Sequence, residues 1–461
     1  MEFRTVGKAD ASHLNSIVGP ERFSMGQSNL ELHSKDQSYH PASLPEAVIW
    51  PVNRTEVSEI LRYANERLIP VTGWGSGSSV EGNPIPVQRG LVLDFSLMTR
   101  IPEIREADFQ ADVEPGVIYQ DLNEKLRHRG LFFAPDPGAR ATIGGMLANN
   151  ASGIRTVRYG STRANTLRLT VVLASGEILE MGSRSSKTSS GYDLINLFVG
   201  SEGTLGLVVQ ATVRLQGMCE EISAAIATFA NIENAAEAVF ELKRSGLDPA
   251  SLELLAEECA ALINKEKGLG LAVLPTLFIE FHGAGKTQIQ EATNMAREIC
   301  QSTGCHHFLS GIERAERVNI LKARYEMAET IIRNHPGCSH TVIDVAVPVS
   351  AYSEVISLAR EEVLKAAMPG YTFGHAGDGN LHLVLMGKTG DKGQMAVIDQ
   401  LSDRLVRKAL EVGGTATGEH GIGIGKRKFM EAEHGASLNW MKKIKTLFDP
   451  NGILNPGKIF P

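Results

Sequence analysis

The stretch "PVTGWGSGSSVEG", Pro70 to Gly82, decides the reading of the N-terminal half of the chain. It follows a helical pattern and the apolar start of a strand, and it then alternates glycine with serine. Small residues allow consecutive backbone N–H groups to approach an anion closely. The stretch therefore predicts a loop that cradles a phosphate or pyrophosphate.

Two common nucleotide-binding patterns do not fit the glycine-rich stretches of this chain. A G-x-G-x-x-G fingerprint that starts at Gly73 has Ser78 where its last glycine belongs. Near the C-terminus, "EHGIGIGKR" would need glycine at His420 and serine or threonine at Arg427 to be a phosphate loop of an NTPase. These mismatches argue against a Rossmann nicotinamide site and against an NTPase.

Two further small-residue stretches lie in the same region: "PDPGARATIGGMLANNASG" at 135–153 and "GSEGTLGLV" at 200–208. One glycine-rich loop alone is more often a plain turn. Three of them predict close backbone approach to a large, extended cofactor that carries phosphate, because glycine is the residue that permits such an approach.

The distribution of strand-like, helical and turn-forming stretches along the chain predicts two α+β domains. From about 45 to 215, short strand-like runs such as "LVLDF" and "LRLTVVLASGEIL" alternate with Gly, Ser and Pro clusters. Helices are predicted at 54–68, with Val57, Ile60, Leu61 and Ala64 on one face, and at 118–130, ended by Gly130. After about Gly217, amphipathic helices such as "NIENAAEAVFELKRSG" alternate with apolar strands such as "TLFIEFHG", "TVIDVAVPV" and "GNLHLVLM", which predicts an antiparallel sheet.

Composition limits the class of protein. The 461 residues carry 46 basic and 53 acidic side chains, a net charge of −7, which argues against a nucleic-acid partner. The first residues lack the apolar core of a secretory signal, and the most apolar segment, 269–283, is interrupted by Pro275 and Glu280, so we expect no transmembrane segment. The cysteines form no C-x-x-C pair and are expected to be reduced core thiols of a cytoplasmic protein without its own iron–sulfur cluster: Cys219, Cys259, Cys300, Cys305 and Cys338.

The order of motifs along the chain resembles one enzyme family. These motifs run from "PVTGWGSGSS" through "PDPG…TIGGMLANNASG…YG" and "GSEGTLG" to "GHAGDGNLH", "GEHGIG" and "LNPGKIF". They resemble the FAD-linked D-2-hydroxy-acid dehydrogenases of the vanillyl-alcohol-oxidase superfamily, which include D-lactate dehydrogenase and the flavin subunit of glycolate oxidase. The resemblance extends from about Ser38 to the C-terminus.

The resemblance implies an α+β protein with a bipartite FAD-binding domain of the vanillyl-alcohol-oxidase type at 1–217. It also implies an α+β cap domain with an antiparallel sheet at 218–424 and a C-terminal segment, 425–461, that returns to the FAD domain. The FAD would be non-covalent, because the first loop offers no histidine or cysteine. Trp74 departs from the family, which often has arginine there. The implied cofactor-binding residues are Gly75, Ser76, Gly77, Ser78, Ser79, Pro135, Gly138, Thr142, Gly144, Gly145, Ser152, Glu202, Gly203, Gly206 and Asn455.

The ten residues "GHAGDGNLHL", Gly374 to Leu383, combine a turn with two histidines. Asp378-Gly379 is a common pair in tight hairpin turns, and on that interpretation the histidines are incidental. Alternatively, strands that fold back on one another bring the imidazoles of His375 and His382 towards one point. Two histidines alone are weak evidence for a metal site.

The resemblance adds a carboxylate and a third histidine to this turn. It implies that His375, His382 and Glu419 bind a divalent metal, zinc or manganese, and that His420 is the catalytic base. It also implies that Arg324, in "LKARYE", binds the substrate carboxylate. Asn380 is a second candidate for that carboxylate.

The resulting expectation is an FAD- and metal-dependent enzyme that oxidises a short D-2-hydroxy acid and passes hydride to flavin N5. D-lactate is the first candidate for the substrate. A glycolate oxidase flavin subunit and a D-2-hydroxyglutarate dehydrogenase are the alternatives within the family. A non-haem metal oxygenase built on His375, His382 and Glu419 is the alternative from another class. The electron acceptor is left open among a quinone, an electron-transfer protein and an iron–sulfur partner subunit. A homodimer and a peripheral position at the inner face of the membrane also stay open.

Overall fold

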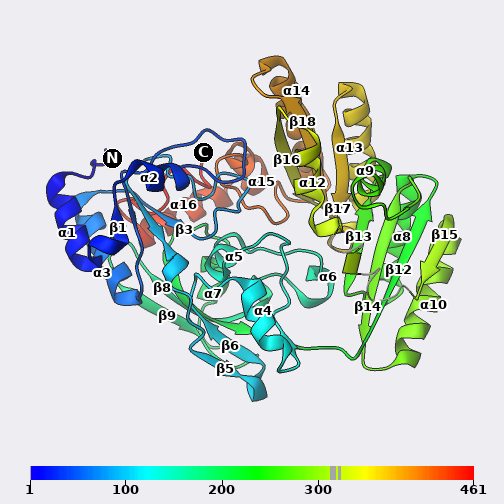
Figure 1. Ribbon diagram of the computed structural model, residues 1–461, viewed down its shortest axis with the longest axis horizontal. Helices are drawn as coiled ribbons and strands as arrows, with labels where there is room; N and C mark the ends of the chain where they lie inside the picture. Colours follow the sequence, from blue (N-terminus) through cyan, green and yellow to red (C-terminus); the bar gives the residue numbers. More distant parts are fainter. Residues whose placement is uncertain (1, 312–317, 320–322) are drawn as a thin grey trace. The chain divides into compact units, whose positions relative to one another are not determined.

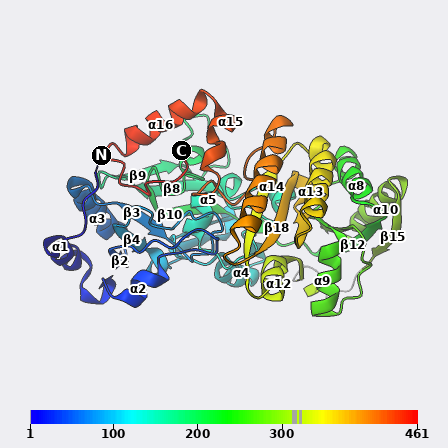
Figure 2. The ribbon, with the colours of Figure 1, turned by 90° about the horizontal axis from the view of Figure 1, so that it is seen from above.

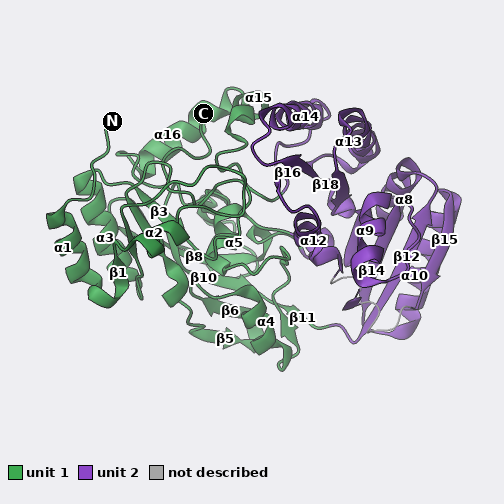
Figure 3. Cartoon of the chain, turned by 45° about the horizontal axis from the view of Figure 1, so that its top comes forward, with its two compact units in different colours: residues 1–152, 160–218, 419–461 green, residues 153–159, 219–418 purple. Residues whose placement is uncertain are grey.

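The computed structural model describes residues 2–311, 318–319 and 323–461, which form two compact units. Unit 1 comprises 1–152, 160–218 and 419–461, and unit 2 comprises 153–159 and 219–418 (Figure 3). The sequence led us to expect boundaries after 217 and 424. In the structure the chain changes unit after 218 and 418, and the short segment 153–159 belongs to unit 2.

Unit 1 contains a small sheet in which three strands run parallel; Figure 1 labels β3, and Figure 2 labels β2, β4 and β3. Its order is β1 (Phe23–Ser24), β2 (Ala47–Ile49), β4 (Leu91–Asp94) and β3 (Val71–Trp74). Helix α3 (Arg54–Arg67) connects β2 to β3, and its first turn is capped by the Asn53 side chain, which accepts hydrogen bonds from two backbone N–H groups. The face predicted for this helix is buried, which confirms the periodicity argument. The N-terminal helices are α1 (Lys8–Val18) and α2 (Gln27–Leu32).

The larger sheet of unit 1 is antiparallel. Its order is β5 (Glu103–Arg105), β6 (Gln110–Val113), β10 (Leu207–Arg214), β8 (Thr166–Val172) and β9 (Ile178–Gly182). Apolar residues of this sheet share a core with α4 (Tyr119–Arg127), α5 (Ile143–Asn149) and α7 (Leu194–Phe198). A two-stranded pair, β7 (Leu131–Phe132) with β11 (Gln216–Gly217), precedes the passage into unit 2.

The C-terminal segment packs within unit 1. After α15 (Met430–His434) and α16 (Ser437–Phe448), Leu454 forms a parallel bridge with Val71 at the start of β3. The side chains of Ile453 and Leu454 are fully buried in the core beneath the parallel strands. The tail therefore reaches the strand that leads into the first glycine-rich loop.

Unit 2 is built on a seven-stranded antiparallel sheet, as the alternating pattern predicted. The order is β15 (Cys305–Ser310), β12 (Glu221–Phe229), β14 (Thr276–Gly283), β13 (Ser251–Leu255), β17 (Gly370–Gly374), β18 (Asn380–Lys388) and β16 (Cys338–Ala346). Figure 2 shows one row of helices along the sheet: α8 (Ile232–Arg244), α10 (Lys286–Ser302), α13 (Tyr352–Ala366) and α14 (Lys392–Glu411). Helices α9 (Glu257–Lys267) and α12 (Met327–Asn334) cover an apolar core on the other face, and α6 (Thr156–Tyr159) is contributed by the short inserted segment.

The five cysteines are free thiols, but only Cys259 and Cys300 are buried. The expectation of core thiols is therefore wrong for Cys219, Cys305 and Cys338, which are partly exposed. Among the helices of the described residues, none has the length and apolar character required to cross a bilayer.

Candidate active site

The histidine-containing turn is a hairpin that brings its two imidazoles together. Strands β17 and β18 pair antiparallel with Phe373 opposite His382, and a short 3-10 turn at Ala376–Asp378 connects them. The Asn380 N–H closes the turn on the His375 carbonyl oxygen at 3.2 Å. The ring centroids of His375 and His382 lie 5.2 Å apart. The turn expected at Asp378-Gly379 is present, and the two imidazoles converge as the second interpretation expected; their binding of a metal stays a prediction.

Gly379 is required by this turn for two reasons. Its φ of +70° lies in the left-handed region, which favours glycine. A Cβ at this position would also collide with the Val347 carbonyl oxygen. The Gly379 carbonyl in turn accepts the Val347 N–H at 3.0 Å. The glycine thus lets the turn pack directly against the segment that follows β16.

A buried carboxylate holds His375. Glu253, in the middle of β13, is 0% exposed. Its two carboxylate oxygens lie 2.8 and 2.9 Å from His375 Nδ1. Arg324 Nη2 lies 2.8 Å from the same carboxylate, and the guanidinium stacks over the Phe373 ring at 4.7 Å. The predicted substrate-binding arginine is therefore buried and already paired through one end of its guanidinium.

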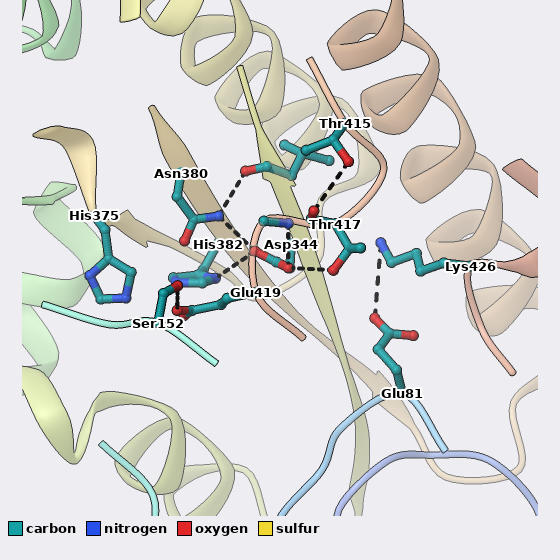
Figure 4. A network of polar contacts seen from close by, with 12 residues as sticks. Glu81, Ser152, Asp344, His375, Asn380, His382, Thr415, Thr417, Glu419 and Lys426 are labelled. Carbon is teal, nitrogen blue, oxygen red and sulfur yellow. Dashed lines mark hydrogen bonds and ion pairs between the residues drawn. The ribbon is translucent and has the colours of Figure 1, made fainter. Parts of the chain in front are cut away.

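A second buried carboxylate, that of Asp344, connects β16 to β18 and to the segment that ends unit 2 (Figure 4). Asp344 on β16 is directly opposite His382 on β18, with 3.5 Å between Asp344 Oδ1 and His382 Nδ1. Asp344 accepts hydrogen bonds from Asn380 Nδ2 at 2.7 Å, from the Thr417 hydroxyl at 2.8 Å and from the Gly418 N–H at 2.8 Å. One carboxylate thus connects a candidate ligand, a candidate substrate-binding residue and the last residues of unit 2.

Sequence reasoning missed both carboxylates. Each is the single charged residue of a short apolar strand, Glu253 in "SLELL" and Asp344 in "TVIDVAV". A charged group at a position whose neighbours are all apolar is expected to be buried and paired. That signal was present, but the partners could not be identified from it.

Glu419 and His420 begin the last segment of unit 1 and are held by the end of α5 and the stretch that follows it. The Ser152 hydroxyl donates to Glu419 Oε2 at 2.6 Å, and Asn149 Nδ2 donates to the His420 carbonyl oxygen at 3.2 Å. The stretch that contains Asn149 and Ser152 is the one that the family resemblance places along the flavin. The predicted base is therefore anchored, within unit 1, to the predicted flavin-binding segment.

The first glycine-rich loop has the form expected of an anion cradle. It follows β3 directly, and within the described chain the backbone N–H groups of Ser76 to Ser79 donate no hydrogen bond to the protein. A Cβ at Gly75 would collide with the Thr142 hydroxyl, so the first two loops touch. That hydroxyl also caps α5, by accepting the Gly145 N–H at 3.1 Å. These features fit a phosphate-bearing cofactor.

Trp74, which departs from the family pattern, contributes its side chain to the core. It is 7% exposed and packs with Val48 and Val92. It supplies no positive charge where the family often has arginine, so contacts to phosphate in this loop would come from backbone N–H groups and serine hydroxyls.

The third loop and the C-terminal tail are tied together by two predicted cofactor residues. The Glu202 carboxylate accepts the N–H groups of Ile422 and Gly423 at 2.6 and 2.9 Å, and burial raises the pKa of this carboxyl. Asn455 Nδ2 donates to the carbonyl oxygens of Asn83 and Glu202 at 3.0 and 2.7 Å. Glu202 therefore stabilises the loop that follows His420, and Asn455 ties the tail to the backbone at Asn83 and Glu202. The contact of either side chain with FAD stays a prediction.

The other predicted cofactor residues lie near these loops. Pro135 and Gly138 precede α5, Gly144 and Gly145 form its first turn, and Gly203 and Gly206 lie in the turn before β10. Glycine is needed at Gly144, where a Cβ would lie 2.7 Å from the Pro115 Cβ.

Comparison with known proteins identifies two families along the chain. The description "FAD binding domain" matches residues 45–182, and "FAD linked oxidases, C-terminal domain" matches residues 219–459. A mitochondrial D-lactate dehydrogenase (cytochrome) of Arabidopsis thaliana is 36% identical over 100% of this chain and 81% of its own. A glycolate oxidase subunit, GlcD, of Bacillus subtilis is 35% identical over 97% of this chain and 96% of its own.

Solved structures share the fold at low identity. A 4-ethylphenol oxidase from Gulosibacter chungangensis superimposes with a TM-score of 0.82, at 20% identity, over 100% of this chain and 99% of its own. An alkyldihydroxyacetonephosphate synthase gives 0.75 at 16% identity, over 99% of this chain and 86% of its own. The architecture is that of the vanillyl-alcohol-oxidase type, as the sequence resemblance implied.

Proposed function

Because this chain belongs to the FAD-linked oxidases and is an FAD-dependent D-2-hydroxy-acid dehydrogenase, we propose that it oxidises a short D-2-hydroxy acid, D-lactate first, to the 2-oxo acid. The observation that carries the proposal is the β17–β18 hairpin, which sets His375 and His382 side by side with a ring-centroid distance of 5.2 Å. A pair of imidazoles at this spacing is suited to a divalent cation.

The proposed metal ligands are His375, His382 and Glu419, and the metal is zinc or manganese. The donor set supports this, since two imidazoles and one carboxylate bind such cations and leave positions open for substrate. A hydrogen bond supports it too. The Gly418 N–H donates to Asp344, which lies opposite His382, and Glu419 follows Gly418 in the chain. A bound divalent cation supplies positive charge that lowers the pKa of a substrate hydroxyl.

His420 is the proposed base. Oxidation of a hydroxy acid removes a proton from the hydroxyl and a hydride from Cα, and we assign the proton to the imidazole of His420. Bound FAD, held non-covalently, supplies the hydride acceptor. The Asn149 side chain supports this role by holding the His420 backbone.

Arg324 and Asn380 are the proposed substrate-binding residues, with different tasks. The Arg324 Nε–H has no hydrogen-bond partner among the described residues and suits a carboxylate oxygen. Asn380 cannot donate to that carboxylate, because Asp344 Oδ1 and the Val345 carbonyl oxygen already accept from its amide nitrogen at 2.7 and 2.9 Å. Its buried Oδ1 has no partner in the described chain and accepts hydrogen bonds, so we assign it to the substrate hydroxyl.

A glycolate-oxidising flavin subunit is the second candidate, favoured by the likeness to the Bacillus subtilis protein. D-2-hydroxyglutarate oxidation stays an alternative substrate class. The non-haem oxygenase alternative is disfavoured by the match to an FAD-binding domain at 45–182. For the electron acceptor we propose one of three classes: a quinone, an electron-transfer protein or an iron–sulfur partner subunit.

The test is a substrate screen with purified, yellow enzyme. D-lactate, glycolate, D-2-hydroxyglutarate and D-2-hydroxybutyrate are mixed anaerobically with the enzyme, and bleaching of the flavin is followed. We expect D-lactate to reduce the flavin fastest and L-lactate to be inactive. A flavin that none of the 2-hydroxy acids reduces would refute the proposed activity.

A further inference from the structure

Burial of the Glu253 side chain costs free energy. A carboxylate with 0% exposure loses its hydration, and that loss must be offset by hydrogen bonds and an opposite charge. Arg324 supplies the charge at 2.8 Å, and His375 supplies the hydrogen bond through Nδ1. These residues come from separate parts of unit 2: β13, the region just before α12, and the residue after β17. The arrangement is therefore specific to the tertiary fold.

The bond to Glu253 determines which nitrogen of His375 carries hydrogen. An ionised carboxylate only accepts hydrogen bonds, so the hydrogen must be on Nδ1. The lone pair of neutral His375 is then on Nε2, and a metal ligand requires such a lone pair. Contact of Nδ1 with both carboxylate oxygens also restricts rotation of the ring.

We infer that Glu253 is a positioning residue, which holds His375 in the Nδ1–H tautomer and in the orientation required to bind a divalent metal through Nε2. Arg324 keeps the carboxylate in place from its other side. This inference rests on the proposed metal site and assigns it a residue outside the ligand set. Carboxylates behind metal-binding histidines act in this way in many proteins, and their loss typically weakens metal binding by about 10- to 100-fold.

The same unit contains a matched control. Glu280 is also buried, and His282 Nε2 lies 2.6 Å from its carboxylate. The other nitrogen of His282, Nδ1, lies 2.9 Å from the Tyr159 hydroxyl, so protein groups occupy both ring nitrogens. Glu280→Gln therefore makes the same substitution in another buried Glu–His pair without touching a proposed ligand.

The experiment compares Glu253→Gln with Glu280→Gln. Zinc affinity is measured by competition with a chromophoric chelator, and imidazole tautomers are read in metal-free protein from the ¹⁵N shifts of labelled histidine. We expect Glu253→Gln to bind zinc about 10- to 100-fold more weakly than wild type and to lose the uniform Nδ1–H tautomer of His375, because glutamine can accept or donate. Glu280→Gln should bind zinc within about twofold of wild type, since its histidine lies outside the ligand set.

Two outcomes separate this inference from the proposed function. If wild type binds zinc and Glu253→Gln binds it equally well, the positioning role is wrong and the metal site stands. If wild-type protein binds no zinc or manganese, the metal site is wrong and the inference falls with it. Should Glu253→Gln fail to fold because Arg324 is left unpaired, the double variant Glu253→Gln, Arg324→Met removes both charges and is measured in the same way.

Discussion

His420 is the side chain on which the proposed proton transfer depends. Loss of a general base typically costs about 10²- to 10⁴-fold in rate, so His420→Ala should lose that much in anaerobic flavin reduction by D-lactate. Stopped-flow bleaching of the flavin isolates this step from reoxidation. FAD should stay bound, because the glycine-rich loops are unchanged.

The control for this variant is His434→Ala, which removes a partly exposed histidine at the end of α15. It should reduce its flavin at the wild-type rate. Both variants must first be shown to contain stoichiometric FAD and metal, since a lost ligand would imitate a lost base. Near-wild-type flavin reduction by a fully loaded His420→Ala enzyme would show that another group takes the proton.

At the scale of an element, the β17–β18 hairpin depends on Gly379. Gly379→Ala should lower the free energy of unfolding by more than about 1 kcal/mol, because alanine is strained at positive φ and its Cβ meets the Val347 carbonyl oxygen. Gly390→Ala is the matched control: φ there is +84°, but no atom lies within 4 Å of an added Cβ. Denaturant unfolding of both variants separates the collision from the backbone strain. Equal losses in the two variants would mean that the collision is relieved at no cost.

The C-terminal tail offers a prediction on pH. Lys458 is 2% exposed, and burial lowers the pKa of its ammonium to about 8, below the usual 10.5. Between these values the unfolded chain binds more protons at this residue than the folded chain, so the contribution of Lys458 to stability increases as pH rises from 8 to 10.5. Relative to Lys458→Met, wild type should gain at most about 3 kcal/mol across that window, measured by denaturant unfolding at each pH. A difference that stays constant with pH would contradict the depressed pKa.

At the scale of the whole molecule, catalysis by the proposed mechanism needs both the flavin and the metal. Treatment with a chelator should abolish turnover of D-lactate and leave the flavin absorption spectrum unchanged, because none of the three proposed metal ligands lies in the glycine-rich loops proposed to hold FAD. Zinc or manganese should restore activity, and magnesium, which prefers oxygen ligands, should not. Full turnover in enzyme shown to be metal-free would exclude the metal from the reaction.

Local patterns in the sequence were sufficient for much of this protein. The buried face of α3, the antiparallel sheet of unit 2, the three glycine-rich loops and the hairpin at His375 all depend on residues a few positions apart. Helical periodicity, strand alternation and turn chemistry act over that range, and the order of the motifs was enough to indicate the family.

Only the tertiary structure decided which charged groups meet. Glu253 is separated from His375 by 122 positions, and strand order places β13 beside β17. Asp344 meets His382 because β16 and β18 pair in one particular register, which no local pattern specifies. Likewise, Trp74 enters the core and Glu202 binds the loop after His420 through contacts between distant segments. The sequence determined the candidate ligands, and long-range packing determined the carboxylates that hold them, because a buried charge takes whichever partner the fold brings within reach.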